Sequence, residues 1–216
     1  TVPSTPLQDA LDARSGIVCA IGAGGKKTTL AALFEQAAGR VALTCTTLTP
    51  PFACVPDTAR YLAPLGELGQ WLATDRQRRV GYGLPSDKAH RVGPLPVAAI
   101  PRLHVLGGFQ LTLVKADGAR MRWIKAPGEH EPQVVPASTV LAISSIQAVG
   151  RTLTASVAHR PERISAVTGL PEGGTITAAT IADLYTRPGG LNTRTGGGRV
   201  IPVLTMVDGA QQLAIA

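Results

Sequence analysis

The residues best suited to chemistry lie in the segment GAGGKKTT, which follows a short apolar stretch. Glycines permit positive φ angles, and the missing Cβ atoms let backbone N–H groups approach the oxygens of an anion. A lysine adds a full positive charge beside terminal phosphates, and a hydroxyl at a helix start can bind Mg²⁺. The segment therefore predicts a phosphate-binding turn made of Gly22, Ala23, Gly24, Gly25, Lys26, Lys27, Thr28 and Thr29.

This turn matches the phosphate-loop pattern GxxxxGK[ST] only in part. If Lys26 is the phosphate lysine, the glycines keep their places but Lys27 stands where a hydroxyl belongs. If Lys27 is that lysine, Lys26 takes a glycine position. We favour Lys26, which leaves Thr28 to bind the metal, and the turn then resembles the short GxxGKTT loop of Mur-type ligases. The plain alternative is a glycine turn with exposed lysines.

Asp117 is the carboxylate best placed to work with this turn, because it lies near the end of a predicted strand. At the carboxyl edge of a parallel sheet such a side chain can reach a metal or its water, although an Asp–Gly turn is the alternative. Thr46 and Thr47 end another predicted strand at the same edge. Lys26 and Asp117 are thus the candidate catalytic residues, and Thr28 and Asp117 the candidate Mg²⁺ ligands. The candidate nucleotide is ATP or GTP.

The elements that position these residues alternate between short apolar stretches and helical patterns, which predicts an α/β protein. A helix between two buried strands makes a βαβ unit with parallel strands. The expected fold is a three-layer, mostly parallel sheet with a P-loop-like nucleotide-binding topology. Strands are expected over Gly16–Gly22, Arg40–Thr46, Leu111–Arg120, Thr139–Ser144 and Arg199–Asp208, and helices over Thr5–Ala13, Lys27–Ala38, Leu65–Ala73, Pro161–Thr168 and Ala178–Thr186.

The chain length of 216 residues suits one domain, and we expect a single P-loop-like α/β domain over residues 1–216. Residues 50–104 have the weakest pattern and predict a small, β-containing insertion packed beside the main sheet. Within it, Arg78–Gly83 and His90–Pro96 are expected to form a hairpin.

The composition of the chain indicates which classes of partner to expect. The chain has 21 Lys and Arg against 14 Asp and Glu, a formal net charge of +7. The basic residues are scattered and do not alternate with aromatic residues, so nucleic acid is not an expected partner. Cys19 and Cys45 lie in apolar stretches, which predicts buried thiols in a reducing compartment. Since no stretch approaches a membrane span and nothing at the start reads as a signal peptide, we expect a cytoplasmic protein without a membrane partner.

Several stretches, taken in order, resemble the YqeC-type family of accessory proteins of selenium-dependent hydroxylases. They are GAGGKKTTL, TCTTLTPP, LVKADGARMRWIKAPGEHEP, AHRPERISAVTG, ITAATIADLYTRPGGL and VIPVLTMVD, and they span about Ile17 to Asp208. The family is similar to P-loop nucleotide-binding proteins and is associated with the maturation of molybdenum hydroxylases, some of which carry labile selenium. The resemblance implies a nucleotide-dependent accessory role without an assigned reaction.

The chain departs from the family pattern at some of these stretches. Lys27 replaces a threonine of the family loop GAGGKTTT, Lys115 replaces the glutamate of VEADGA, and Leu48 replaces the histidine of TTTTH. The last family strand ends LNKxD, like a base-recognition motif; this chain keeps Asp208 but has Thr205 and Met206 in place of the asparagine and the lysine. Two consequences are open: a lysine partly replaces Mg²⁺ by neutralising phosphate charge, or hydrolysis is lost while anion binding remains.

A second cluster of polar residues falls in the family stretches around the histidines. His and Glu side chains can exchange protons or bind a metal, and Arg can hold an anion through two N–H groups. No compact metal-binding spacing joins the histidines, and the alternative is that these residues cap helices and pin loops. The candidate second site comprises Lys125, His130, Glu131, His159 and Arg160.

Three functions remain open at this point. The leading one is a nucleotide-binding accessory protein, with slow NTP hydrolysis as an option, in the maturation of a molybdenum hydroxylase that is selenium-dependent in some cases. Its partners would be a nucleotide and the hydroxylase or its cofactor. The second is a non-catalytic, degenerate P-loop binder of a cofactor dinucleotide or of a partner protein. The third is an ATP-dependent ligase or kinase, for whose acceptor domain the chain leaves little room.

Overall fold

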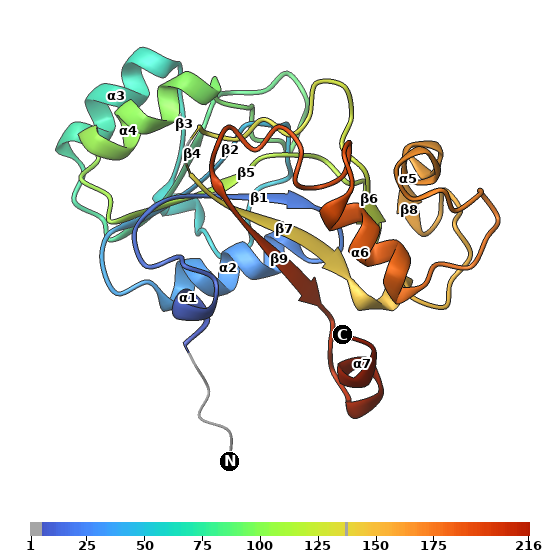
Figure 1. Ribbon diagram of the computed structural model, residues 1–216. Coiled ribbons are helices and arrows are strands. Elements are labelled where there is room, and N and C mark those ends of the chain that lie inside the picture. The colour runs from blue at the N-terminus through green and yellow to red at the C-terminus, as the bar shows by residue number, and fades with distance from the viewer. Residues whose placement is uncertain (1–5, 137) are drawn as a thin grey trace.

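A parallel sheet forms the centre of the protein. The computed structural model describes residues 6–136 and 138–216. In these residues, seven strands lie side by side in the order β3-β4-β2-β5-β1-β7-β9, with every neighbouring pair parallel (Figure 1). β6 and β8 form a separate two-stranded parallel sheet. The strands are β1 (Gly16–Gly22), β2 (Val41–Cys45), β3 (Arg60–Leu62), β4 (Arg79–Gly83), β5 (Leu111–Lys115), β6 (Ile124–Lys125), β7 (Thr139–Ser145), β8 (Ala158–His159) and β9 (Arg199–Thr205).

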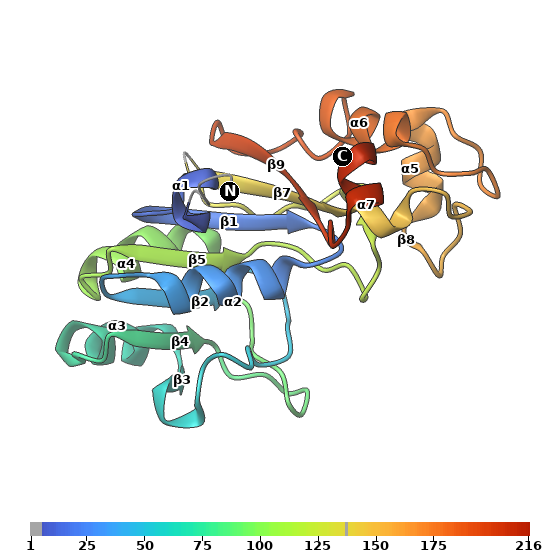
Figure 2. The ribbon, with the colours of Figure 1, turned by 90° about the horizontal axis from the view of Figure 1, so that it is seen from below.

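Helices cover both faces of the large sheet (Figure 2). One face packs against α1 and α2, and the other packs against α3 and α4. The remaining helices, α5, α6 and α7, are formed by the C-terminal part of the chain. The helices are α1 (Leu7–Ala10), α2 (Lys26–Gln36), α3 (Leu65–Thr74), α4 (Ile100–Leu106), α5 (Pro161–Thr168), α6 (Ala178–Thr186) and α7 (Ala210–Ile215), with short 3₁₀ helices at Asp57–Ala59, Val97–Ala99 and Ile146–Ala148.

The central strands divide their side chains between two core layers, because successive side chains of a strand point to opposite faces. In β1, Val18 and Ala20 pack in the layer of α2, whereas Cys19 and Ile21 pack in the layer of α3 and α4. Burial on both faces explains why these strands read as continuous apolar stretches. The α/β class and the three-layer, parallel arrangement predicted from the sequence are confirmed. The P-loop-like topology stays a prediction.

A third, smaller core lies beyond the carboxyl ends of the central strands. It joins β6 and β8 to α5 and α6 through apolar side chains such as Ile124, Ala158, Ile164 and Leu184. This cluster was not expected from the sequence, because its two strands are only two residues long. It places residues 117–125 beside the end of β1 (Figure 2).

The prediction of a hairpin within residues 50–104 is wrong. Arg79–Gly83 forms β4, which pairs in parallel with β2 on one side and β3 on the other, so it is part of the large sheet. One antiparallel bridge, Leu84 with Gly93, is the nearest counterpart of the hairpin. Val80 and Tyr82 are buried, and their burial makes a sheet position more favourable than an exposed hairpin.

Two predicted strands end earlier than expected, at the edge where the candidate residues lie. β5 stops at Lys115, and Arg120 and Met121 beyond it have positive φ angles of 46° and 62°. β9 stops at Thr205, and Met206 has a φ of 60°. A left-handed residue cannot continue a strand. The chain therefore turns directly after β9, and it turns a few residues beyond the end of β5. The helix start predicted at Thr5 lies outside the described residues.

The cysteines are free thiols, with Cys19 and Cys45 buried as predicted and Cys54 half-buried. No helix among the described residues combines the length and apolar character that crossing a bilayer requires.

Candidate functional site

The candidate site lies where the carboxyl ends of β1, β5 and β7 meet. β1 lies between β5 and β7, so the chain that leaves β1 at Gly22 passes between their ends. We call residues 22–25, which join β1 to α2, the glycine loop (Figure 2). Lys26 follows the glycine loop directly and is the first residue of α2. In parallel α/β sheets this edge is where ligands bind.

The glycine loop needs its glycines. Gly22, Gly24 and Gly25 have φ angles of +91°, +76° and +131°, which side chains rarely tolerate. A Cβ atom on Gly22 would lie 2.1 Å from the carbonyl oxygen of Ile143, and one on Gly24 would lie 2.5 Å from the carbonyl oxygen of Trp123. The loop is therefore held tightly against the end of β7 and the segment before β6.

The loop presents a row of backbone N–H groups at the start of α2. The N–H of Gly22 donates to Asp117 Oδ2 at 2.8 Å, that of Ala23 to the Ile143 carbonyl at 2.8 Å, and that of Thr29 to the Gly25 carbonyl at 2.9 Å. Between them, no acceptor among the described residues binds the N–H groups of Gly24, Gly25, Lys26, Lys27 and Thr28. Such a row at a helix N-terminus suits the oxygens of an anion.

Lys26 turns back over the loop. Its Nζ donates to the Gly22 carbonyl and lies 2.8 Å from Asp117 Oδ1. The side chains of Lys26 and Asp117 are only 5% and 2% exposed. Burial lowers the pKa of Lys26, and the opposing charge of Asp117 offsets part of that shift. The two residues singled out as catalytic candidates therefore form one buried ion pair.

Three lysines surround the single carboxylate of Asp117. Besides Lys26, Lys125 Nζ lies 3.1 Å from Asp117 Oδ2, and Lys115 Nζ donates to the Asp117 carbonyl at 2.7 Å. Lys115 and Lys125 are buried, at 7% and 0% exposed. Burial and the nearby charge of Lys26 lower the pKa of Lys115 to about 8. The three lysines make the site strongly cationic.

Ion pairs extend from Asp117 to the predicted second site. Lys125 Nζ lies 2.6 Å from Glu131 Oε2, and Arg160 Nη1 lies 2.7 Å from the same oxygen. The chain of charges thus runs Lys26–Asp117–Lys125–Glu131–Arg160. Burial opposes ionisation of Glu131, but the hydrogen bonds and charges of Lys125 and Arg160 prevail and lower its pKa to about 2. Two clusters that the sequence presents separately form one continuous network.

His159 lies beside this network without joining the ion pairs. It is the register partner of Lys125 in the β6–β8 sheet. Burial, with the charges of Arg160 and Lys125, lowers its pKa to about 4. The imidazole is therefore neutral near pH 7, and we expect it to act as a hydrogen-bonding group rather than a cation.

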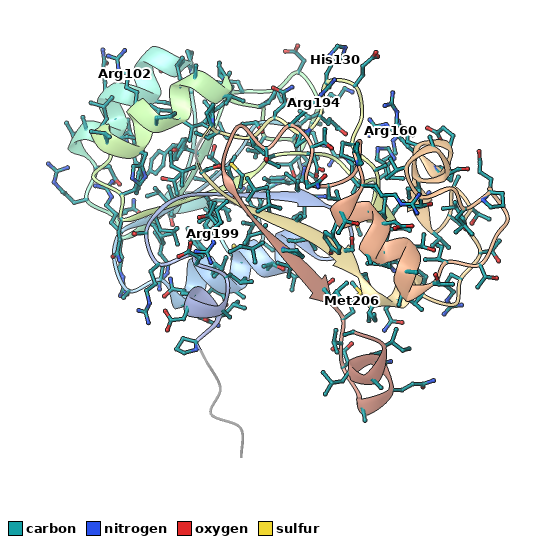
Figure 3. All side chains as sticks on the ribbon, viewed as in Figure 1. Arg102, His130, Arg160, Arg194, Arg199 and Met206 are labelled. Carbon is teal, nitrogen blue, oxygen red and sulfur yellow. The ribbon has the colours of Figure 1, made fainter. Side chains whose placement is uncertain are left out.

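The other candidate residues lie at different distances from the network. Thr47 accepts a hydrogen bond from Lys115 Nζ at 3.2 Å, while Thr46 is buried and donates to the Gln133 carbonyl at 2.7 Å. Thr28 is exposed at the start of α2. His130 is exposed on the loop between β6 and β7, whereas Arg160 lies at the start of α5 (Figure 3).

Some candidates make no contact that links them to the site. In the part of the chain that the structure describes, the side chains of Lys27, Thr29 and Asp208 form no hydrogen bond or ion pair. Asp208 is exposed between β9 and α7. Among the same residues, no three His, Cys, Asp or Glu side chains gather as a metal site would require.

Sequence reasoning missed the residues that hold the glycine loop from outside. Thr205 donates its hydroxyl to the Gly24 carbonyl, and Ser145 and the Trp123 carbonyl lie where a Cβ on Gly24 would fall. Sequence reasoning noted Lys115 only as a departure from the family pattern, but the structure places its ammonium group against Asp117. A lysine within an apolar strand is the one sequence signal that pointed there.

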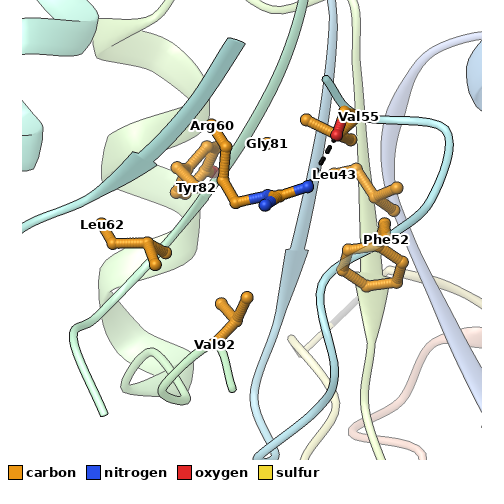
Figure 4. A pocket seen from close by; sticks show the side chains of 8 residues that line it. All are labelled: Leu43, Phe52, Val55, Arg60, Leu62, Gly81, Tyr82 and Val92. Atoms are coloured by element: carbon orange, nitrogen blue, oxygen red, sulfur yellow. Dashed lines mark hydrogen bonds between the residues drawn. The ribbon is translucent and has the colours of Figure 1, made fainter. Parts of the chain in front are cut away.

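A separate pocket beside β3 and β4 is too small to be a ligand site. Its cavity volume is about 10 Å³, which is room for about one water molecule. Arg60 reaches along it and donates to the Val55 carbonyl at 2.8 Å (Figure 4). The other lining residues are Leu43, Phe52, Leu62, Gly81, Tyr82 and Val92.

The fold and the site together define an α/β protein whose parallel sheet carries a glycine loop and a buried cationic cluster at its carboxyl edge. The chain belongs to the YqeC protein family, whose pattern matches residues 18–162. It is 28% identical over 182 residues to the uncharacterized protein YqeC of Escherichia coli strain K12, a match that covers 82% of this chain and 70% of the relative. No solved structure matches the chain.

Proposed function

We propose that this protein binds a nucleotide by its phosphates, which lie against the glycine loop and the start of α2. The observation that carries the proposal is the row of five consecutive N–H groups, Gly24 to Thr28, that bind no acceptor among the described residues. They lie at the start of an eleven-residue helix, whose dipole adds a partial positive charge. Gly24 and Gly25 are half-buried and Thr28 is exposed, so a ligand can reach them.

The charge balance of the network supports an anionic ligand. In the described part of the chain, two carboxylates, those of Asp117 and Glu131, face four cationic side chains, those of Lys26, Lys115, Lys125 and Arg160. A buried surplus of positive charge is costly unless an opposite charge compensates it. Phosphate groups beside Lys26 would supply that compensation, whereas a neutral ligand would not.

Replacing Lys26 tests this proposal. In the variant Lys26→Met, the new side chain is unbranched and of similar length, but it lacks the charge that faces the loop. We expect it to weaken ATP or GTP binding at least 30-fold, equivalent to about 2 kcal/mol for a hydrogen bond to a charged group. Isothermal titration calorimetry with each nucleotide measures the change.

The matched control is Lys88→Met, because Lys88 is exposed and its side chain makes no hydrogen bond or ion pair among the described residues. It should bind as the wild type does. Equal affinity of the wild type and the Lys26→Met variant for both nucleotides, or no binding by the folded wild type, would show that the glycine loop is only a turn.

The finer proposal is an accessory role in the maturation of a molybdenum hydroxylase, and it is supported by membership of the YqeC family and the resemblance described above. The same variant extends the test to this role. In cells whose own copy is deleted, hydroxylase activity should return with the wild-type gene and not with Lys26→Met. Full activity without either gene would exclude the role while leaving nucleotide binding untouched.

Nucleotide binding should take up protons in mildly alkaline solution. Lys115 has a pKa of about 8, so at that pH about half of the molecules carry its proton. Phosphate charge nearby favours the ammonium form and raises this pKa. Calorimetry in two buffers of different ionisation enthalpy should therefore give an uptake of up to about half a proton at pH 8, where the phosphate groups of the nucleotide are already ionised. Proton release at pH 8 would contradict this expectation.

A further inference from the structure

We propose that the site binds its phosphate ligand as the free anion, without a divalent cation, because its lysines occupy the place and role of Mg²⁺. This inference rests on the proposed function, since it concerns the form in which the nucleotide binds. It departs from the assignment of Thr28 and Asp117 as Mg²⁺ ligands made from the sequence. It follows from the donors, the burial and the charges around Asp117.

Each carboxylate oxygen of Asp117 has a lysine ammonium group within 3.1 Å. Oδ1 lies 2.8 Å from Lys26 Nζ, though without hydrogen-bond geometry. Oδ2 accepts from the Gly22 N–H at 2.8 Å and lies 3.1 Å from Lys125 Nζ. Mg²⁺ requires nearly octahedral oxygen ligands at close range. A cation at Oδ1 would have to displace Lys26, and one at Oδ2 would have to compete with Lys125 and the Gly22 N–H.

Two of the three lysines have further partners that hold them in place. Lys125 also donates to the Gly118 carbonyl at 2.7 Å and pairs with Glu131 at 2.6 Å. Lys115 also donates to the Thr47 hydroxyl at 3.2 Å. Even if Lys26 moved to a phosphate, two buried ammonium groups would stay beside Asp117. In a buried site with little screening, they would repel a divalent cation strongly.

The remaining donors for a metal are weak. Thr28 is the other predicted ligand, and it is a single, exposed hydroxyl. Among the described residues, no His, Cys, Asp or Glu group of three completes a metal site. In phosphate sites the metal's role is to neutralise charge on the phosphate oxygens. Here Lys26, with Lys27 as the next residue of α2, can supply charge from the protein itself.

The test compares ATP binding to the wild-type protein in excess EDTA and in excess Mg²⁺, with calorimetry as the readout. Free ATP carries two more negative charges than its magnesium complex. We expect the affinity in EDTA to exceed that in Mg²⁺ by about tenfold, a ratio that corresponds to about 1.4 kcal/mol. Equal affinity in the two solutions would contradict the inference, because the site would then accept the magnesium complex as readily as the free anion. Binding that appears only with Mg²⁺ overturns it and leaves the proposed nucleotide function intact. No binding in either solution overturns the function itself.

The variant Lys115→Glu makes the comparison sharper, because it replaces a buried cation with a carboxylate next to Asp117. We expect it to lose affinity for free ATP at least tenfold and to bind ATP better with Mg²⁺ than without. Lys88→Glu is the matched control, with the same charge change at an exposed position, and should keep the wild-type preference. If Lys115→Glu does not fold, Lys115→Met should reduce the wild-type preference for free ATP. An unchanged preference in the folded variant would refute the role of Lys115.

Discussion

The Asp117→Asn variant is expected to lose about 3–5 kcal/mol of its free energy of unfolding at neutral pH, as for other buried ion pairs that lose one partner. The amide keeps the size of the side chain and an oxygen that can accept from the Gly22 N–H. Among the described residues, Asp117 is the only carboxylate that pairs with Lys26, and without it Lys125 keeps Glu131 as its ionic partner. Urea denaturation of the two proteins, followed by circular dichroism, measures the loss.

The loss should depend on pH in a defined direction. Without Asp117 the neighbouring lysines release their protons more easily in the folded state, whereas the unfolded chain keeps the ordinary lysine pKa of 10.5. The unfolded state then binds more protons, so stability rises with pH. The deficit of Asp117→Asn should therefore be smaller in alkaline buffer than at neutral pH.

A surface carboxylate provides the control. Asp183 pairs with Arg187 at 2.9 Å on α6, and their side chains are 28% and 51% exposed. Asp183→Asn should change the free energy of unfolding by less than about 0.5 kcal/mol. If Asp117→Asn is no more costly than this control, the lysines around Asp117 are already neutral and the cationic site does not exist as described.

The Gly22→Ala variant is the second change with a large expected effect. Its Cβ would lie 2.1 Å from the Ile143 carbonyl oxygen, and the backbone φ is +91°. A left-handed alanine alone costs about 1–2 kcal/mol, and the collision with β7 backbone must be relieved by moving one strand. We expect a total loss of at least about 3 kcal/mol, together with loss of nucleotide binding. Urea denaturation and nucleotide titration check the two parts.

Gly173→Ala separates the collision from the backbone strain. Gly173 has a φ of +85°, close to that of Gly22, but open space lies where its Cβ would be. It should cost only about 1–2 kcal/mol and leave nucleotide binding unchanged. Similar losses for the two variants would mean that the glycine loop can move away from β7.

The strands and the loop could be predicted because their signals are local. The continuous apolar stretch before Gly22 predicts a buried strand, and the following glycines and lysines predict a turn into a helix. The structure has β1 over Gly16–Gly22 as predicted, and α2 starts one residue before the expected Lys27. α5 and α6 have the expected bounds, because Pro161 and Thr177 mark their starts.

The network around Asp117 could not be predicted, because its members are distant in the sequence and meet only through the strand order. The position of Lys115 near the glycine loop follows from its place on β5, next to β1. Its contact with Thr47 depends on β2 lying on the other side of β5. Lys125 and Glu131 depend on the two-residue strand β6, which has no sequence pattern of its own. The hairpin prediction for Arg78–Gly83 fails because β4 pairs with β2 and β3, and the local sequence pattern does not show these partners.

The hydrogen bond from Thr205 to the glycine loop has a consequence for the synthesis of the protein. This hydroxyl bonds to a carbonyl 181 positions earlier in the chain, and Asp117 bonds to the loop across 95 positions. A ribosome therefore releases the loop long before it releases either partner. The emerging chain cannot complete this edge of the sheet until Thr205 has left the ribosome, so the proposed nucleotide site would form only after β9 has been made.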